Sequence, residues 1–271
     1  MSAMTITLPM CSVDFMDTTL SVEEQAIADR IQELKQQLGD DLLILGHHYQ
    51  RDSIVMHADF LGDSFMLSQK AAASDAKYIV FCGVHFMAES ADILTSDDQH
   101  VMLPNLRAGC SMADMATLAD VEVAWGELLK ESGLSDPINR ANPEEVAGDG
   151  EAYLVPVTYM NSSADLKDFV GRHGGVVCTS SNAEGVLNWA FERAGPSGAV
   201  LFFPDQHLGR NTGLAMGIPS ERMPTWTPGI GAMGTLENAR IVLWHGFCSV
   251  HKRFTPQQIT EFRERHPDGI V

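Results

Sequence analysis

Two cysteines of this chain stand in similar surroundings. Cys110 follows Gly109 directly, Cys248 lies two positions after Gly246, and His251 comes three positions later. Thiolate and imidazole groups are ligands that suit zinc and iron–sulfur clusters. No two cysteines are separated by only two residues, so a zinc ribbon or a thioredoxin-type site is not supported. The cysteine spacing therefore leaves both packing and metal binding open.

Polar side chains gather at a second kind of position, directly after short apolar runs. The clusters at residues 47–50, 158–161 and 179–182 each follow such a run. Ser64 and Ser180 each precede an expected helix, where hydroxyl and backbone N–H groups can hold carboxylate or phosphate. A plain helix cap is the alternative role for each serine. If the apolar runs are parallel strands, these clusters share the edge of a sheet at which ligands bind.

The elements expected around these clusters alternate between helix and strand. Residues 21–38 predict an amphipathic helix, because Ser21 can cap it and four apolar residues from Ile27 to Leu38 keep helical spacing. The run 42–46 is short and does not alternate, which is typical of a parallel strand covered on both faces. Alternating strands and helices indicate an α/β fold with parallel sheets.

The same order of elements occurs twice, and each copy ends near a glycine and a cysteine. A third copy begins with the helix 256–265 and the segment 267–271, so we expect a chain that lacks most of a third domain. The expected division is an N-terminal segment and helix at 1–39, a first α/β domain at 40–130, a linker at 131–151, a second α/β domain at 152–250, and the truncated start of a third at 251–271.

Three further expectations concern local structure. Residues 53–61 predict a helix. Residues 209–238 contain Gly, Pro and Met without periodicity, and predict a long surface loop. Cys82 and Cys178 lie inside apolar runs, and we expect them to pack in the core.

The composition excludes several classes of protein. The 271 residues include 36 acidic and 18 basic side chains, a net charge of −18 that disfavours binding to nucleic acid. No uncharged apolar run reaches the roughly 18 residues of a membrane span. The first basic residue is Arg30, so the charged start of a signal peptide is missing. We expect a soluble, cytoplasmic protein with reduced thiols.

Eight short motifs, in order, resemble those of the quinolinate synthase family, the A protein of NAD and pyridine nucleotide biosynthesis. The motifs are Gly46-His47-His48-Tyr49-Gln50, Gly62-Asp63-Ser64, Leu103-Pro104, Gly109-Cys110-Ser111-Met112-Ala113-Asp114, Tyr159-Met160-Asn161, Cys178-Thr179-Ser180-Ser181-Asn182-Ala183, Phe203-Pro204-Asp205 with Leu208-Gly209, and Trp244-His245-Gly246-Phe247-Cys248 with His251. The resemblance runs from about residue 40 to the end of the sequence.

The resemblance implies pseudo-repeated three-layer α/β/α domains with parallel sheets, two of the family's three being present here. Each domain of the family gives one cysteine to a single [4Fe–4S] cluster, and Cys110 and Cys248 match the first two ligands. An iron without a protein ligand acts as a Lewis acid while this transferase condenses iminoaspartate with dihydroxyacetone phosphate to quinolinate. The implied partners are these two substrates, with L-aspartate oxidase as a candidate protein partner. The oligomeric state stays open.

The matching motifs also imply roles for polar residues. Catalytic roles fall to His47, Tyr49, Tyr159 and His251. Substrate binding falls to His47, Ser64, Tyr159, Met160, Asn161 and Ser180, and metal binding to Cys110 and Cys248. Tyr159 and Asn161 are expected to contact the carboxylates of iminoaspartate. His266 is left out, because its His-Pro-Asp precedes the expected strand, whereas the family's His-Pro-Glu follows it.

Two other functions stay open. A mononuclear zinc or iron hydrolase would use Cys110, Cys248, His251 and a water. A non-catalytic two-domain remnant would bind small anions or a partner. With two of three cluster thiolates, we expect the chain by itself to be inactive and to expose apolar surface. The net negative charge opposes long-range attraction of two anionic substrates.

Overall fold

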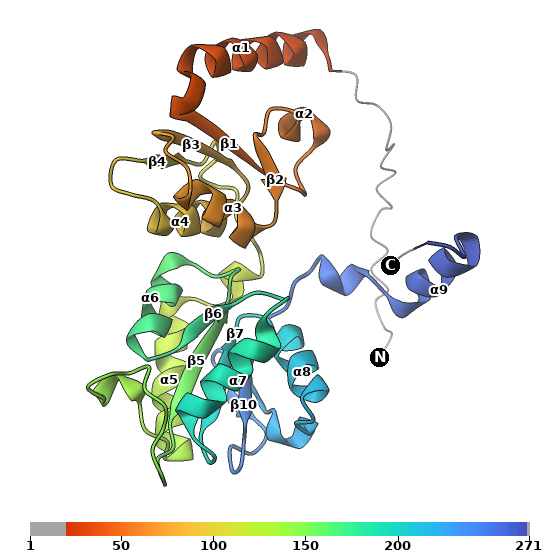
Figure 1. The fold of residues 1–271 in the computed structure, drawn as a ribbon. Coiled ribbons are helices and arrows are strands. Elements are labelled where there is room, and N and C mark those ends of the chain that lie inside the picture. Colours follow the sequence, from red (N-terminus) through yellow and green to blue (C-terminus); the bar gives the residue numbers. More distant parts are fainter. Residues whose placement is uncertain (1–19, 270–271) are drawn as a thin grey trace.

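A computed structural model describes residues 20–269, and two sheets organise this part of the chain (Figure 1). All pairs in the first sheet are parallel, in the order β2-β1-β3-β4. Its strands are β1 (Leu42–His47), β2 (Phe60–Gly62), β3 (Tyr78–Cys82) and β4 (His100–Met102), and its helices are α2 (Asp52–Val55), α3 (Ser64–Ala72) and α4 (His85–Leu94).

The second sheet has the order β6-β5-β7-β10-β8-β9, and only the β8–β9 pair is antiparallel. Its strands are β5 (Leu154–Tyr159), β6 (Val176–Cys178), β7 (Ala199–Phe203), β8 (Thr225–Thr227), β9 (Gly231–Met233) and β10 (Ile241–Trp244). Its helices are α5 (Leu118–Ser132), α6 (Ala164–Arg172), α7 (Ala183–Ala194) and α8 (Gln206–Ala215).

Helices cover both faces of the second sheet. Successive residues of a strand point to opposite faces, so an apolar strand presents side chains to a layer of helices on each side. Leu201 and Phe203 of β7 pack with α5 and α6, whereas Val200 and Phe202 pack with α7 and α8. The predicted α/β fold with three layers is confirmed. The structure shifts the first predicted domain boundary, since residues up to 130 include α5, and Trp125 of α5 packs on the second sheet.

The core of the first sheet also draws on the second half of the chain. Helices α3 and α4 cover one face, with Leu67 and Phe86 in the cluster. Met160 is buried in this same cluster, and Tyr159 and Val177 pack against it. The carboxyl ends of β5 and β6 therefore lie against the first unit, which places polar residues of both units near the junction.

Two local predictions were wrong. The helix predicted at 53–61 is limited to α2, after which β2 pairs with β1 as an edge strand. The loop predicted at 209–238 contains α8, β8 and β9. Two glycines that suggested a loop, Gly209 and Gly213, are packing positions in α8, because an added Cβ would lie 2.6 Å from Leu243 Cδ2 and 2.5 Å from the Met223 sulfur, respectively. Small residues bring α8 close to the sheet.

The two outer helices make few apolar contacts. Helix α1 (Val22–Leu38) has the predicted cap at Ser21, with a reciprocal bond to Glu24. Ile27 on its apolar side is nonetheless exposed. The predicted last helix is α9 (Pro256–Arg265), which has no buried residue and extends from the second unit (Figure 1). The strand expected at 270–271 lies outside the described residues. No helix within 20–269 is long and apolar enough to cross a membrane.

Candidate active site

The end of β1 contributes a buried imidazole. His47 is 6% exposed, and burial is the main reason why its pKa falls to about 4; His48 adds to the shift and Asp63 opposes it. Its Nδ1 accepts a long hydrogen bond of 3.4 Å from the backbone N–H of Tyr49. The Tyr49 side chain is 76% exposed, with its ring against that of His47. His47 is therefore neutral at physiological pH and stands at the polar edge.

A cavity of about 260 Å³ collects five of the predicted substrate-binding residues. Ser64, Tyr159, Met160, Asn161 and Ser180 all line it. Ser64 is the first residue of α3, whose cap is the preceding aspartate rather than the serine itself. Since Ser64 comes from the first unit and the other four from the second, this cavity lies between the two sheets.

A second cavity, of about 440 Å³, adjoins the first. Cys248 and His251 line it, and Tyr159 and Ser180 line both cavities. Burial raises the pKa of Tyr159, a hydrogen bond with Ser180 opposes that shift, and the nearby Cys178, Asp205 and Cys248 raise it further. Tyr159 thus keeps its proton and is a hydrogen-bond donor at the point where the cavities meet.

The loops that carry the two predicted cluster ligands touch each other. The hydroxyls of Ser111 and Ser249, the residues after Cys110 and Cys248, lie 3.3 Å apart. Both thiols are free and half-buried. Trp244 Nε1 supports this junction by donating to the carbonyl of Met115 at 2.8 Å. The fold therefore brings together the loops that carry two cysteines 138 positions apart.

Not every predicted residue lines the same space. Cys110 lines a separate cavity, together with His85 and Glu89 of α4. His47 and Tyr49 line neither of the two adjoining cavities. No group of three His, Cys, Asp or Glu side chains in residues 20–269 could hold a metal ion. The three-ligand site of the hydrolase alternative is therefore absent from the described residues.

Comparison with known proteins settles the family. A family model described as "Quinolinate synthetase A protein" matches residues 29–271. The chain belongs to this family. It is 57% identical to a quinolinate synthase of Corynebacterium glutamicum over 247 residues, which cover 89% of this chain and 58% of the relative. The quinolinate synthase of Rhodopirellula baltica is 49% identical over 263 residues, covering 91% and 62%.

The curated relatives that the chain matches are longer than the chain itself. The relative from Herpetosiphon aurantiacus is 50% identical over 254 residues, which cover 92% of this chain and 62% of the relative. The chain thus spans about three fifths of the length of the curated relatives that it matches.

No role was predicted from the sequence for several polar residues that line the second cavity, of about 440 Å³. Asp205, His207, Asn211 and Lys252 also line it. Asp205 and His207 lie at the start of α8, where β7 ends, and Asn211 lies in the middle of that helix. The motif Phe203-Pro204-Asp205 marked this place in the sequence. The signal was present, but the glycines that follow suggested a loop.

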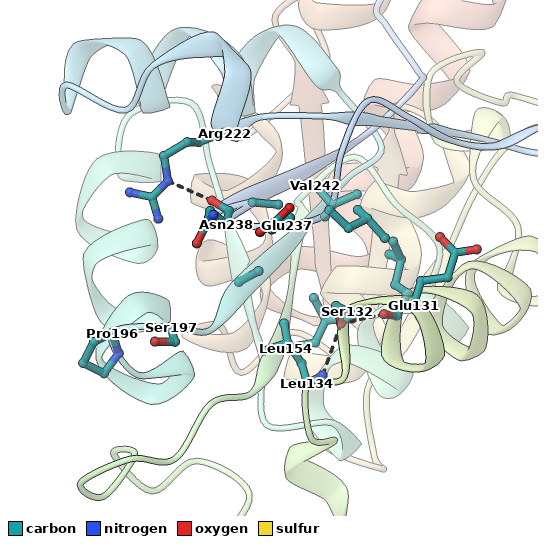
Figure 2. Close-up of a pocket in the computed structure, with 14 residues that line it drawn as sticks. Glu131, Ser132, Leu134, Leu154, Pro196, Ser197, Arg222, Glu237, Asn238 and Val242 are labelled. Carbon is teal, nitrogen blue, oxygen red and sulfur yellow. Dashed lines mark hydrogen bonds between the residues drawn. The ribbon is translucent and has the colours of Figure 1, made fainter.

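A further cavity, of about 360 Å³, lies where strands of the second sheet begin (Figure 2). Leu154 of β5 and Val242 of β10 line it, beneath Arg222, whose Nε donates to the carbonyl of Asn238 at 2.8 Å. None of the predicted site residues lines it. Ligands of parallel sheets bind at the carboxyl ends of strands, so we place the site at the two adjoining cavities.

Proposed function

We propose that this chain forms the first two domains of a quinolinate synthase. The enzyme would condense iminoaspartate with dihydroxyacetone phosphate, with loss of phosphate and two waters. The observation that carries the proposal is the pair of cavities that meet at Tyr159 and Ser180. Residues of motifs from both sheets line them, although nothing in local structure requires these motifs to meet.

The donor set fits a shared [4Fe–4S] cluster. Cys110 and Cys248 are free thiols on adjoining loops, and cysteine thiolates are the usual ligands of such clusters. We assign the remaining protein ligand to the part of the relatives' length that this chain does not span. When bound, the cluster would supply a Lewis-acidic iron to substrate oxygens.

Three polar residues are suited to hold the dicarboxylate. The hydroxyls of Tyr159 and Ser180 and the amide of Asn161 line the cavity between the sheets. Hydrogen bonds from a protonated phenol and an amide to ionised carboxylates are charge-assisted and therefore strong. Ser64 lies at the N-terminus of α3, where backbone N–H groups and the helix dipole favour an anion. Local donors of this kind offset the repulsion from the net charge.

Three side chains are candidates for exchanging protons or hydrogen bonds with the substrates. His47 is neutral well below pH 7, so its imidazole can accept a proton from a substrate at the ring nitrogen that does not contact Tyr49. Tyr159, with its raised pKa, stays protonated and donates a hydrogen bond to a substrate oxygen. His251 lines the cavity beside Cys248 and is the third candidate.

The location and the source of substrate complete the proposal. We place the reaction in the cytoplasm, with L-aspartate oxidase as the enzyme that delivers the hydrolysable imine.

The test compares this chain with a chimera that continues it with the C-terminal part of the Corynebacterium glutamicum relative. After anaerobic reconstitution, the chimera should bind four irons per chain and form quinolinate, detected by mass spectrometry, and the 271-residue chain should not. Cys110→Ala and Cys248→Ala should abolish both cluster and product, whereas Cys82→Ala should keep them. A reconstituted chimera that makes no quinolinate, or a Cys110→Ala form that does, would contradict the proposal.

A further inference from the structure

Asp205 is a buried carboxylate at the end of β7 that faces the second cavity. The residue is 4% exposed, and its Oδ1 accepts a hydrogen bond of 2.8 Å from the backbone N–H of His207, which caps α8. Oδ2 accepts no hydrogen bond from the described residues, and the side chain lines the cavity with Tyr159 and Cys248. One oxygen of a nearly buried carboxylate is therefore left for a ligand.

The backbone holds this carboxylate in a fixed place relative to the cysteine loop. Asp205 pairs with Gly246 in a parallel bridge, and Gln206 N donates to the carbonyl of Gly246 at 3.0 Å. A Cβ on Gly246 would lie 2.3 Å from the carbonyl oxygen of Pro204, so the backbone segments at Pro204 and Gly246 are in close contact. Because Cys248 follows two residues later, the carboxylate and the thiol lie at the same edge of the second sheet.

Asp205 is the single carboxylate among the nine residues that line this cavity, and Lys252 is the single lysine. A dicarboxylate held by Tyr159 and Ser180 would be repelled by the negative charge of Asp205, unless the ligand atom nearest to Asp205 carries a hydrogen that can be donated to it. A nitrogen that bears hydrogen satisfies that condition, because it donates a charge-assisted hydrogen bond to the carboxylate. A carbonyl oxygen at the same place would set two acceptors against each other.

We propose that Asp205 selects a four-carbon dicarboxylate with an N–H group at its second carbon over the analogue with oxygen there. The inference rests on the proposed function and adds the reason for its specificity. An imine reacts with water to give the ketone and ammonia, so iminoaspartate is always accompanied by oxaloacetate. The two molecules have nearly the same shape, and Asp205 distinguishes them by the hydrogen on nitrogen.

The experiment measures binding of two four-carbon dicarboxylates to the 271-residue chain. L-Aspartate carries N–H hydrogens at the second carbon and freshly dissolved oxaloacetate carries a carbonyl oxygen there, and both are titrated by NMR. The wild-type chain should bind L-aspartate roughly 10- to 100-fold more tightly, as expected for a hydrogen bond to a charged group. Asp205→Asn keeps an oxygen to cap α8 and should reduce the ratio to about one.

Asp168→Asn is the matched control, because it removes one charge from an exposed ion pair with Arg172 in α6. It should keep the wild-type ratio. Equal binding of both acids by the wild type, an unchanged ratio in Asp205→Asn, or no binding of either acid would overturn the inference. Coincident urea unfolding curves show that Asp205→Asn is folded, and Asp205→Glu, which retains the charge, should keep a preference for L-aspartate.

The chimera separates this inference from the proposed function. Oxaloacetate should inhibit quinolinate formation by the Asp205→Asn chimera and leave the wild-type chimera little affected. If the wild type forms quinolinate and oxaloacetate affects both forms alike, Asp205 has no selective role and the proposed function stands. If the wild type forms no quinolinate although L-aspartate is preferred, the proposed function fails and the carboxylate's selectivity remains.

Discussion

Two glycines inside helices should respond to alanine with opposite signs. A glycine in a helix interior costs about 1 kcal/mol relative to alanine, so either substitution gains that amount from backbone propensity. Gly126, in the middle of α5, has no atom within 4 Å of an added Cβ. Gly126→Ala should therefore raise the free energy of unfolding by about 1 kcal/mol.

Gly209→Ala meets a different surrounding in α8. Its Cβ would lie 2.6 Å from Leu243 Cδ2 and 2.7 Å from Phe202 Cδ1, and both neighbours are fully buried. Carbon atoms in favourable contact are about 3.5–4.0 Å apart, so the core must move by about 1 Å. Overpacking of this kind costs about 1–3 kcal/mol, and contact with two fully buried side chains puts Gly209 toward the upper end of that range, so the net loss after the propensity gain is up to about 2 kcal/mol.

Urea unfolding followed by tryptophan fluorescence measures the change in the free energy of unfolding for both substitutions, which lie in the same α/β unit. All four tryptophans lie in elements of the second sheet and its helices, so their emission reports the unit that contains α5 and α8. The two substitutions should move the midpoint in opposite directions. If Gly209→Ala unfolds at the wild-type midpoint or above it, the claim that small residues set the distance between α8 and the sheet is refuted.

Three further predictions concern the first unit and the thiols. The pKa of His47 is about 4 in the folded chain and about 6.5 in the unfolded chain, so protons bind the unfolded state more tightly. The free energy of unfolding should therefore fall by about 3 kcal/mol as the pH is lowered from 6.5 to 4. His47→Gln should reduce this pH dependence, measured by urea unfolding at a series of pH values. A short bifunctional thiol reagent should join Cys110 to Cys248 in peptide mass spectra, with Cys178 unmodified because burial raises its pKa to about 12. Asp63→Ala removes the acceptor for two backbone N–H groups of α3 and should cost about 1 kcal/mol by circular dichroism, whereas Asp63→Asn should cost less.

Much of the fold was predictable because it rests on local signals. The runs that became β1, β5 and β7 are apolar up to their carboxyl ends and do not alternate, which is typical of strands covered on both faces. The helix at α1 was marked by its cap at Ser21. Parallel strands then bring their carboxyl ends to one edge, which placed the polar clusters before any contact was known.

Other elements depend on partners that are distant in sequence. Strand β2 has three residues, and its place is set by pairing with β1 rather than by propensity. The helical state of α8 depends on contacts of Gly209 with β7 and β10, which no local pattern reveals. For the same reason, the predicted domain boundary puts most of α5 in the first domain, since only tertiary contacts show that its apolar face packs on the second sheet.

The residues of the candidate site also fall into two groups: those that local sequence signals predict and those that only the three-dimensional contacts reveal. Tyr159, Asn161 and Ser180 stand next to strands, so motif and topology together predicted that they share a cavity. Asp205 was quoted only as part of a motif, because its significance lies in burial and in the unused oxygen. The cluster ligands remain a prediction, supported by the contact between Ser111 and Ser249.

The burial of Met160 in the first unit's core has a consequence for how the protein is made. The ribosome releases the strands and helices of the first sheet well before residues 159–177, which complete their apolar cluster. The apolar cluster of the nascent first sheet therefore stays partly exposed to solvent until β5 and β6 leave the ribosome. Stalled synthesis at about residue 130 should yield a chaperone-bound chain rather than a finished domain, so translation speed through this stretch sets how long that exposed state lasts.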